Sequence, residues 1–277
     1  MKGPFFERII IITLFAVAMG FLESAVVVYL RELYYPEGFS FPLTNLADHI
    51  LITELFREIA TMVMLVTVSM LAARKWNIRF AWFIYMFAIW DIFYYIFLWL
   101  LIGWPESLLT WDILFMIPTT WVGPVIAPVI NSLTMILLAS LILLADRWTS
   151  GRADQRTSTS AKATADKSVQ VWASGLRAQG SAGLVRLSGL EWGLLIIGSL
   201  ITITAYIEDY SVYMLDRLTL TEWLGGDHQA EVMSYATTYI PVSFNWILFS
   251  AGTTLFFIVI GLFLRRLFIA SRKNLPQ

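Results

Sequence analysis

Six apolar runs constrain this chain more than any other feature of its sequence. Each run is long enough to cross about 30 Å of hydrocarbon as a helix, which takes about 20 residues. With 58% hydrophobic residues, 14% charged residues and a mean hydropathy of +0.71, the chain carries more apolar surface than a soluble fold can bury. We therefore expect an all-α integral membrane protein, a bundle with transmembrane helices at residues 9–30, 50–73, 80–102, 121–145, 190–207 and 244–268.

The basic residues predict the orientation of these spans. Cytoplasmic loops of membrane proteins are enriched in Lys and Arg. If the N-terminus is cytoplasmic, every Lys and Arg except Arg31, Arg57 and Arg217 falls on the cytoplasmic side, and most acidic residues fall on the outer side. We therefore predict that both termini are inside, in a multi-pass protein of the cell membrane. The compact topology is compatible with a bacterial inner membrane.

The first span has an alternative interpretation. Lys2 and Arg8, followed by an apolar run and Ala16-Val17-Ala18, resemble a secretory signal peptide with its cleavage site. The apolar run continues to Leu30, which is longer than a signal-peptide core and favours an uncleaved first span.

Two segments do not fit the pattern of simple spans and short loops. Residues 104–120 are too short and too interrupted by proline to cross the membrane, so we expect an interfacial or re-entrant segment before the fourth span. Residues 149–189 are rich in Ser, Ala, Thr, Gly and Arg, which predicts a flexible cytoplasmic linker. One membrane domain thus comprises spans 1–4 (1–148), the linker, and spans 5–6 with a long outer loop (190–277).

Charged residues inside the apolar runs are the main functional signal. Even on lenient insertion scales, placing Asp, Lys or Arg at the centre of a membrane helix costs about 2.5 to 3.5 kcal/mol of insertion free energy. Such residues therefore need partners. Glu23 lies in the first span, Glu54, Arg57 and Glu58 lie in the second, and Asp91 lies in the third. Because the first two spans run in opposite directions, Glu23 and Glu58 fall at nearly the same depth. Glu54 and Arg57 are three residues apart and can pair on one helix face.

Further polar residues extend this candidate pocket. If the fourth span begins at Trp121, Pro128 frees the carbonyl of residue 124, which is tolerated beside a water-filled cavity or in a simple proline kink. Asn131, one turn deeper, can line such a cavity or join two helices. The candidate substrate or ion pocket therefore comprises Glu23, Glu54, Arg57, Glu58, Asp91 and Asn131, with Glu208 and Asp209 at the outer end of the fifth span.

Several classes of function are excluded by what the sequence lacks. Without cysteine there is no disulfide, thiolate metal site or iron–sulfur cluster, and only two histidines exclude paired haem ligation within the bundle. We expect no metal and no cofactor. A net charge of −1 gives no attraction to nucleic acid. The motifs GxSxG, HExxH, Walker A and the dinucleotide-binding glycine pattern are absent.

Three functions remain open. The leading hypothesis is transport or permeation of a small solute, a cation or a proton through an outward-facing pocket of carboxylates and arginine. The first alternative is a membrane-embedded enzyme acting on a lipid or isoprenoid-like substrate, with two carboxylates as acid and base or as metal ligands. The second is a structural or assembly subunit whose ion pairs fix helix packing. The sequence indicates the lipid bilayer and a small solute as partners and does not indicate a protein partner.

Overall fold

The chain folds as a multi-pass α-helical membrane protein, as the sequence predicts. The computed structural model describes residues 4–117, 119–161, 186–225 and 229–272. Within these ranges 6 helices are long and apolar enough to cross a membrane. They are α1 (Pro4–Tyr34), α2 (Asp48–Ala72), α3 (Trp76–Ile102), α4 (Ile126–Ala161), α6 (Gly189–Leu215) and α9 (Trp246–Arg272).

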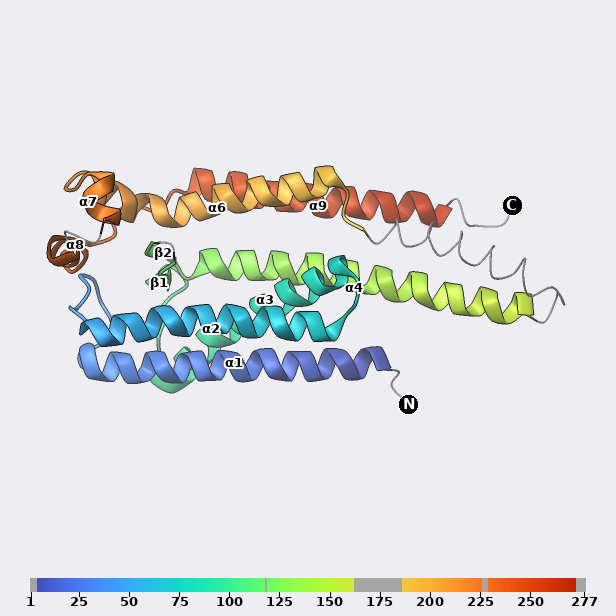
Figure 1. Cartoon of the computed structure of the whole chain (residues 1–277), viewed down its shortest axis with the longest axis horizontal. Helices are drawn as coiled ribbons and strands as arrows, with labels where there is room; N and C mark the ends of the chain where they lie inside the picture. The colour runs from blue at the N-terminus through green and yellow to red at the C-terminus, as the bar shows by residue number, and fades with distance from the viewer. Residues whose placement is uncertain (1–3, 118, 162–185, 226–228, 273–277) are drawn as a thin grey trace.

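The two ends of the bundle differ in structure. Both chain termini lie at one end, as an even number of spans requires (Figure 1). The other end, called the loop end below, carries the loop 35–47, the strands β1 (Trp111–Phe115) and β2 (Trp121–Pro124), and the short helices α7 (Leu220–Leu224) and α8 (Gln229–Ala236). The distribution of basic residues predicts that the loop end faces outward.

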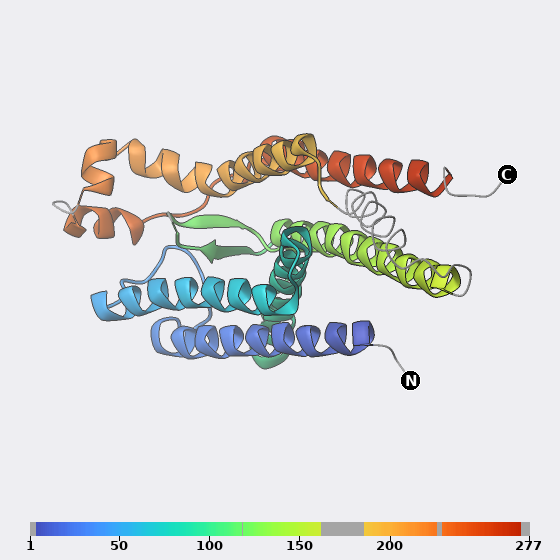
Figure 2. The ribbon, with the colours of Figure 1, turned by 45° about the vertical axis from the view of Figure 1, so that its right-hand side comes forward.

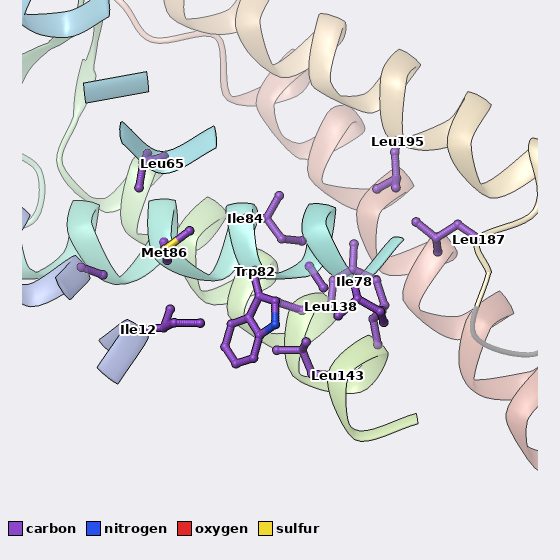
Figure 3. Packing of buried hydrophobic residues seen from close by; sticks show 14 of the residues in the cluster. Ile12, Leu65, Ile78, Trp82, Ile84, Met86, Leu138, Leu143, Leu187 and Leu195 are labelled. Atoms are coloured by element: carbon purple, nitrogen blue, oxygen red, sulfur yellow. The ribbon is translucent and has the colours of Figure 1, made fainter. Parts of the chain in front are cut away.

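The main hydrophobic core lies in the half of the bundle near the termini. Helices α1 and α4 each pack along α3, and α6 packs along α9. Ile12, Leu65, Trp82, Leu143 and other buried apolar side chains from the long helices meet in one cluster (Figure 3). Trp82 is only 1% exposed, so this half of the bundle is tightly filled.

A β-hairpin occupies the segment that the sequence predicts to be interfacial or re-entrant. Strands β1 and β2 pair antiparallel, with Trp111 opposite Pro124 and Asp112 opposite Gly123. The hairpin lies between the pair α1/α2 and the pair α6/α9 (Figure 2). The two strands hydrogen-bond to each other and so satisfy part of their backbone N–H and C=O groups. Backbone polar groups inside a membrane protein need such partners where no bulk water reaches them. The pattern of prolines and apolar residues did not predict this pairing.

The fourth span starts later than the sequence predicts. Because β2 takes residues 121–124, α4 begins at Ile126 instead of Trp121. Pro128 therefore lies in the first turn of α4, where the missing N–H costs no intrahelical hydrogen bond. The prediction that Pro128 frees a carbonyl inside the fourth span was wrong for this reason.

The predicted linker is partly helical. Helix α4 continues to Ala161, well beyond the predicted end of the span at residue 145. Residues 162–185 of the predicted linker lie outside the described residues. The chain then enters α6 through a capping box, in which the Ser188 hydroxyl accepts from the Glu191 N–H and the Glu191 carboxylate accepts from the Ser188 N–H.

Small residues allow α6 and α9 to approach closely. A Cβ atom added at Gly252 would collide with Thr202 and would lie 2.8 Å from the Gly198 carbonyl oxygen. Close approach through small residues is a common means of packing helices in membranes.

We predict that Gly252→Leu lowers the free energy of unfolding by about 2 kcal/mol or more, because the added side chain forces α6 and α9 apart. Unfolding titrations in mixed micelles measure this change. Gly261→Leu is the matched control, since a Cβ atom at this position of α9 meets open space. Equal effects of the two substitutions would contradict the packing described here.

Candidate functional site

A cavity of about 1490 Å³ lies at the loop end, between α1, α2, α3, the hairpin and α8. Its described lining includes six carboxylates and two guanidinium groups, which come from Glu23, Asp48, Glu54, Glu58, Asp91, Asp112, Arg31 and Arg57. The cavity therefore combines a charged interior with an excess of negative groups. Five of the eight residues predicted from the sequence lie in this lining: Glu23, Glu54, Arg57, Glu58 and Asp91.

Arg57 is the centre of an ion cluster that links α1 to α2. Its Nε lies 2.8 Å and its Nη2 2.7 Å from Glu54 Oε2, which confirms the predicted pair on one helix face. Its Nη1 contacts Glu23 Oε2 across the two helices. We call Glu23, Glu54 and Arg57 the Arg57 cluster. The Arg57 side chain is 21% exposed, and the cluster is thus half-buried at the cavity wall.

Glu58 connects α2 to the hairpin instead of joining the Arg57 cluster. Both of its carboxylate oxygens lie 3.1 Å from the backbone nitrogen of Met116, which donates from the residue after β1. Glu58 is buried, so this N–H is a strong fixed partner for the charged form. Glu54 and Glu58 are four residues apart on α2, where two negative charges repel each other, but each carboxylate has its own donor.

Asp91 is a charged residue of the cavity lining that lies near the middle of α3. The Ser132 hydroxyl of α4 donates to its Oδ2 atom at 2.7 Å, and Ser132 is fully buried. This hydrogen bond joins α3 to α4.

Asn131 and Glu208 lie outside the described lining of the cavity. Asn131 donates from Nδ2 to the Tyr206 hydroxyl at 2.8 Å, which joins α4 to α6. Glu208 accepts from Asn245 Nδ2 at 2.6 Å, which joins α6 to the start of α9. Both residues face the α6/α9 side of the hairpin, so the structure does not bring them into the predicted pocket.

Asp209 also lies apart from the cavity and organises the chain before α9. Its carboxylate accepts from the Tyr239 hydroxyl at 2.6 Å and from the backbone N–H groups of Val242 and Ser243, each at 3.2 Å. Burial and the nearby Asp209 carboxylate raise the pKa of Tyr239, so the hydroxyl stays protonated and donates. The role of Asp209 is consequently structural.

The structure adds a second ion pair that sequence reasoning missed. Arg31, in the last turn of α1, places Nη2 3.4 Å from Oδ1 of Asp112 on β1, and the Tyr95 hydroxyl donates to Asp112 Oδ2 at 3.2 Å. Burial raises the pKa of Asp112 to about 6, against the attraction of Arg31. Two features of the sequence could have indicated this pair: Arg31 is one of the few basic residues that do not fall on the cytoplasmic side, and Asp112 is an acid within an apolar run. Pairing them required the hairpin.

Comparisons with known proteins give no further guide to function. No protein-family model matches the chain, and neither the curated proteins nor the solved structures give a match. In the part of the chain that the structure describes, no group of three or more His, Asp or Glu side chains is placed to hold a metal ion. The assignment therefore depends on the cavity and its charges.

We predict that Arg57→Ala lowers the free energy of unfolding by about 3 kcal/mol, because it leaves Glu23 and Glu54 without their counter-ion. The measurement is an unfolding titration in mixed micelles. The control is Lys75→Ala, which removes an ion pair with Asp146 at 2.7 Å whose lysine is 58% exposed. That exposed pair is worth less than about 1 kcal/mol. An effect of Arg57→Ala no larger than that of Lys75→Ala would contradict the stabilising role of the Arg57 cluster.

Proposed function

We propose that this protein carries a positively charged solute or a proton across a bacterial inner membrane, and that the cavity at the loop end is where the cation enters. The observation that carries the proposal is the excess of six carboxylates over two guanidinium groups in the described lining. Acidic groups in a site with low-dielectric walls concentrate cations, and ionisable residues at membrane depth commonly mark ion or proton pathways.

The depth of the carboxylates supports a pathway. Asp48 lies at the first residue of α2, Glu58 lies nearly three turns further along α2, and Asp91 lies near the middle of α3. A cation or hydrated proton that enters the cavity would thus meet carboxylates from its mouth to the middle of the helices. Beyond Asp91, the packed core around Trp82 closes the route. Passage to the other side therefore needs a second conformation, as in alternating-access transporters.

Glu58 supplies a link between binding and the hairpin. Its carboxylate accepts from the Met116 N–H, and a bound cation or proton would compete with that hydrogen bond. Occupancy of Glu58 would weaken the attachment of the hairpin to α2. Arg31 and Asp112 would still hold the other strand end.

A second candidate is a membrane-embedded enzyme acting on a lipid or isoprenoid-like substrate. The cavity volume of about 1490 Å³ favours this candidate, because it exceeds the range of about 300 to 1,000 Å³ that is typical of sites for drug-sized ligands. A larger cavity suits a larger substrate such as a lipid. In that case Glu58 and Asp91, which have no direct arginine partner within the part of the chain that the structure describes, would act as acid and base. Turnover of a lipid by the purified full chain would favour this candidate over transport.

We predict that Asp91→Asn and Glu58→Gln each reduce cation flux at least about tenfold, because each removes a negative charge from the pathway. The assay uses the full chain in proteoliposomes, with protons, sodium and ethylammonium as probes and an internal pH-sensitive or sodium-sensitive dye.

Glu208→Gln is the matched control, since Glu208 is a glutamate near the loop end that lies outside the described lining. It should retain the wild-type flux. Flux that is unaffected by both cavity substitutions, or no flux of any of these probes in the wild type, would overturn the proposed function.

A further inference from the structure

Arg31 is a buried cation that lacks full hydrogen bonding. Its side chain is 9% exposed, and its contact with Asp112 at 3.4 Å is longer than the usual 2.7 to 2.9 Å of a charge-assisted hydrogen bond. Its Nη1 atom is buried and has no hydrogen-bond partner among the described residues. Leaving a buried charged donor unpaired is costly, so this atom is suited to an acceptor that is brought by a ligand.

Two aromatic rings hold the Arg31 guanidinium in place. Its central carbon lies 3.7 Å from the ring centroid of Trp104 and 4.6 Å from that of Phe39. These cation–π contacts fix the orientation of the group without using its N–H donors. Arg31 and Phe39 both line the cavity, so the guanidinium is carried by a residue of the cavity wall. A pre-oriented guanidinium favours a carboxylate or phosphate group, which it binds through paired donors.

Three carboxylates, Glu23, Glu54 and Glu58, lie at a different level of the same cavity from Arg31. Glu23 is eight residues before Arg31 on α1, which corresponds to about 12 Å along the helix axis. The Arg57 cluster places Glu23 beside α2 at the level of Glu58. At the level of Glu58, called the acidic end, the three carboxylates of Glu23, Glu54 and Glu58 outnumber the single guanidinium of Arg57. At the other end the Arg31 guanidinium lies beside the Asp112 carboxylate, and apolar side chains such as Val27, Leu30 and Leu55 line the wall.

We propose that the cavity binds an elongated zwitterion whose carboxylate pairs with Arg31 and whose amine pairs with Glu58, at two levels that lie about 12 Å apart along the axis of α1. An extended peptide spans about 3.3 to 3.6 Å per residue, so the matching ligand is a peptide of three to four residues. The cavity volume of about 1490 Å³ accommodates such a peptide with its side chains. This inference rests on the proposed function, because the amine of the zwitterion is the positively charged group that the acidic end receives.

The test measures peptide binding to the detergent-solubilised full chain by titration calorimetry, with trialanine as the probe. N-acetyl-trialanine lacks the amine charge, and trialanine amide lacks the carboxylate. We expect each blocked peptide to bind the wild type about tenfold more weakly than trialanine, which is the usual worth of a hydrogen-bonded ion pair.

Variants assign each end of the peptide to its residue. The amidation penalty is the factor by which trialanine amide binds more weakly than trialanine, and the acetylation penalty is the same factor for N-acetyl-trialanine. In Arg31→Gln the amidation penalty should fall below about twofold, while the acetylation penalty persists. In Glu58→Gln the acetylation penalty should fall below about twofold, while the amidation penalty persists. If Arg31→Gln fails to fold because Asp112 loses its counter-ion, Arg31→Gln combined with Asp112→Asn removes the pair as a neutral unit. Arg217→Gln is the control, an exposed arginine outside the described lining that should keep both penalties.

The outcomes separate this inference from the proposed function. An amidation penalty that is the same in the wild type and in the Arg31 variants would overturn the inference, as would a complete absence of trialanine binding. If ethylammonium flux remained sensitive to Glu58→Gln in either case, the proposed function would stand without the inference. Absence of both peptide binding and cation flux would overturn both.

Discussion

The contact of Arg57 with Glu23 and Glu54 is the interaction on which the architecture of the loop end depends. A guanidinium group between two carboxylates joins α1 to α2 through long side chains. The two helices each pack against α3, and the cluster spans the space between them near the loop end. A bridge of long side chains leaves room for a cavity where small apolar side chains would close it.

The hairpin completes the cavity because polar contacts from two sides hold it. The Met116 N–H donates to Glu58 on α2, and Asp112 pairs with Arg31 on α1. On the opposite side, a Cβ atom added at Gly123 of β2 would lie 3.1 Å from ring atoms of Tyr206 and Phe244. Polar contacts thus face the cavity, while aromatic packing faces α6 and α9. This difference places the two ion-paired arginines of the cavity, Arg31 and Arg57, on one side of the hairpin.

The sequence predicts the membrane helices well because each must satisfy a length and an apolar composition that are visible in consecutive residues. It also predicts the pair Glu54 and Arg57, which depends only on helical spacing. It fails for Asn131, Glu208 and Asp209, because residues at similar depth can face either side of the bundle and their partners, such as Tyr206, lie far away in the chain. It misses the pair Arg31 and Asp112 because that contact depends on the hairpin, whose short strands carry no clear periodic pattern.

The central claim is that water reaches the charged groups between α1 and α2, and substituted-cysteine labelling tests it most directly. The chain has no native cysteine, so each variant carries one thiol. Thr61 lines the cavity, whereas Leu65, one turn further on the same buried face of α2, is fully buried in the core. A membrane-impermeant thiol reagent added at the outer side should modify Thr61→Cys and leave Leu65→Cys unmodified until the protein is denatured. Equal protection of both thiols would contradict the account.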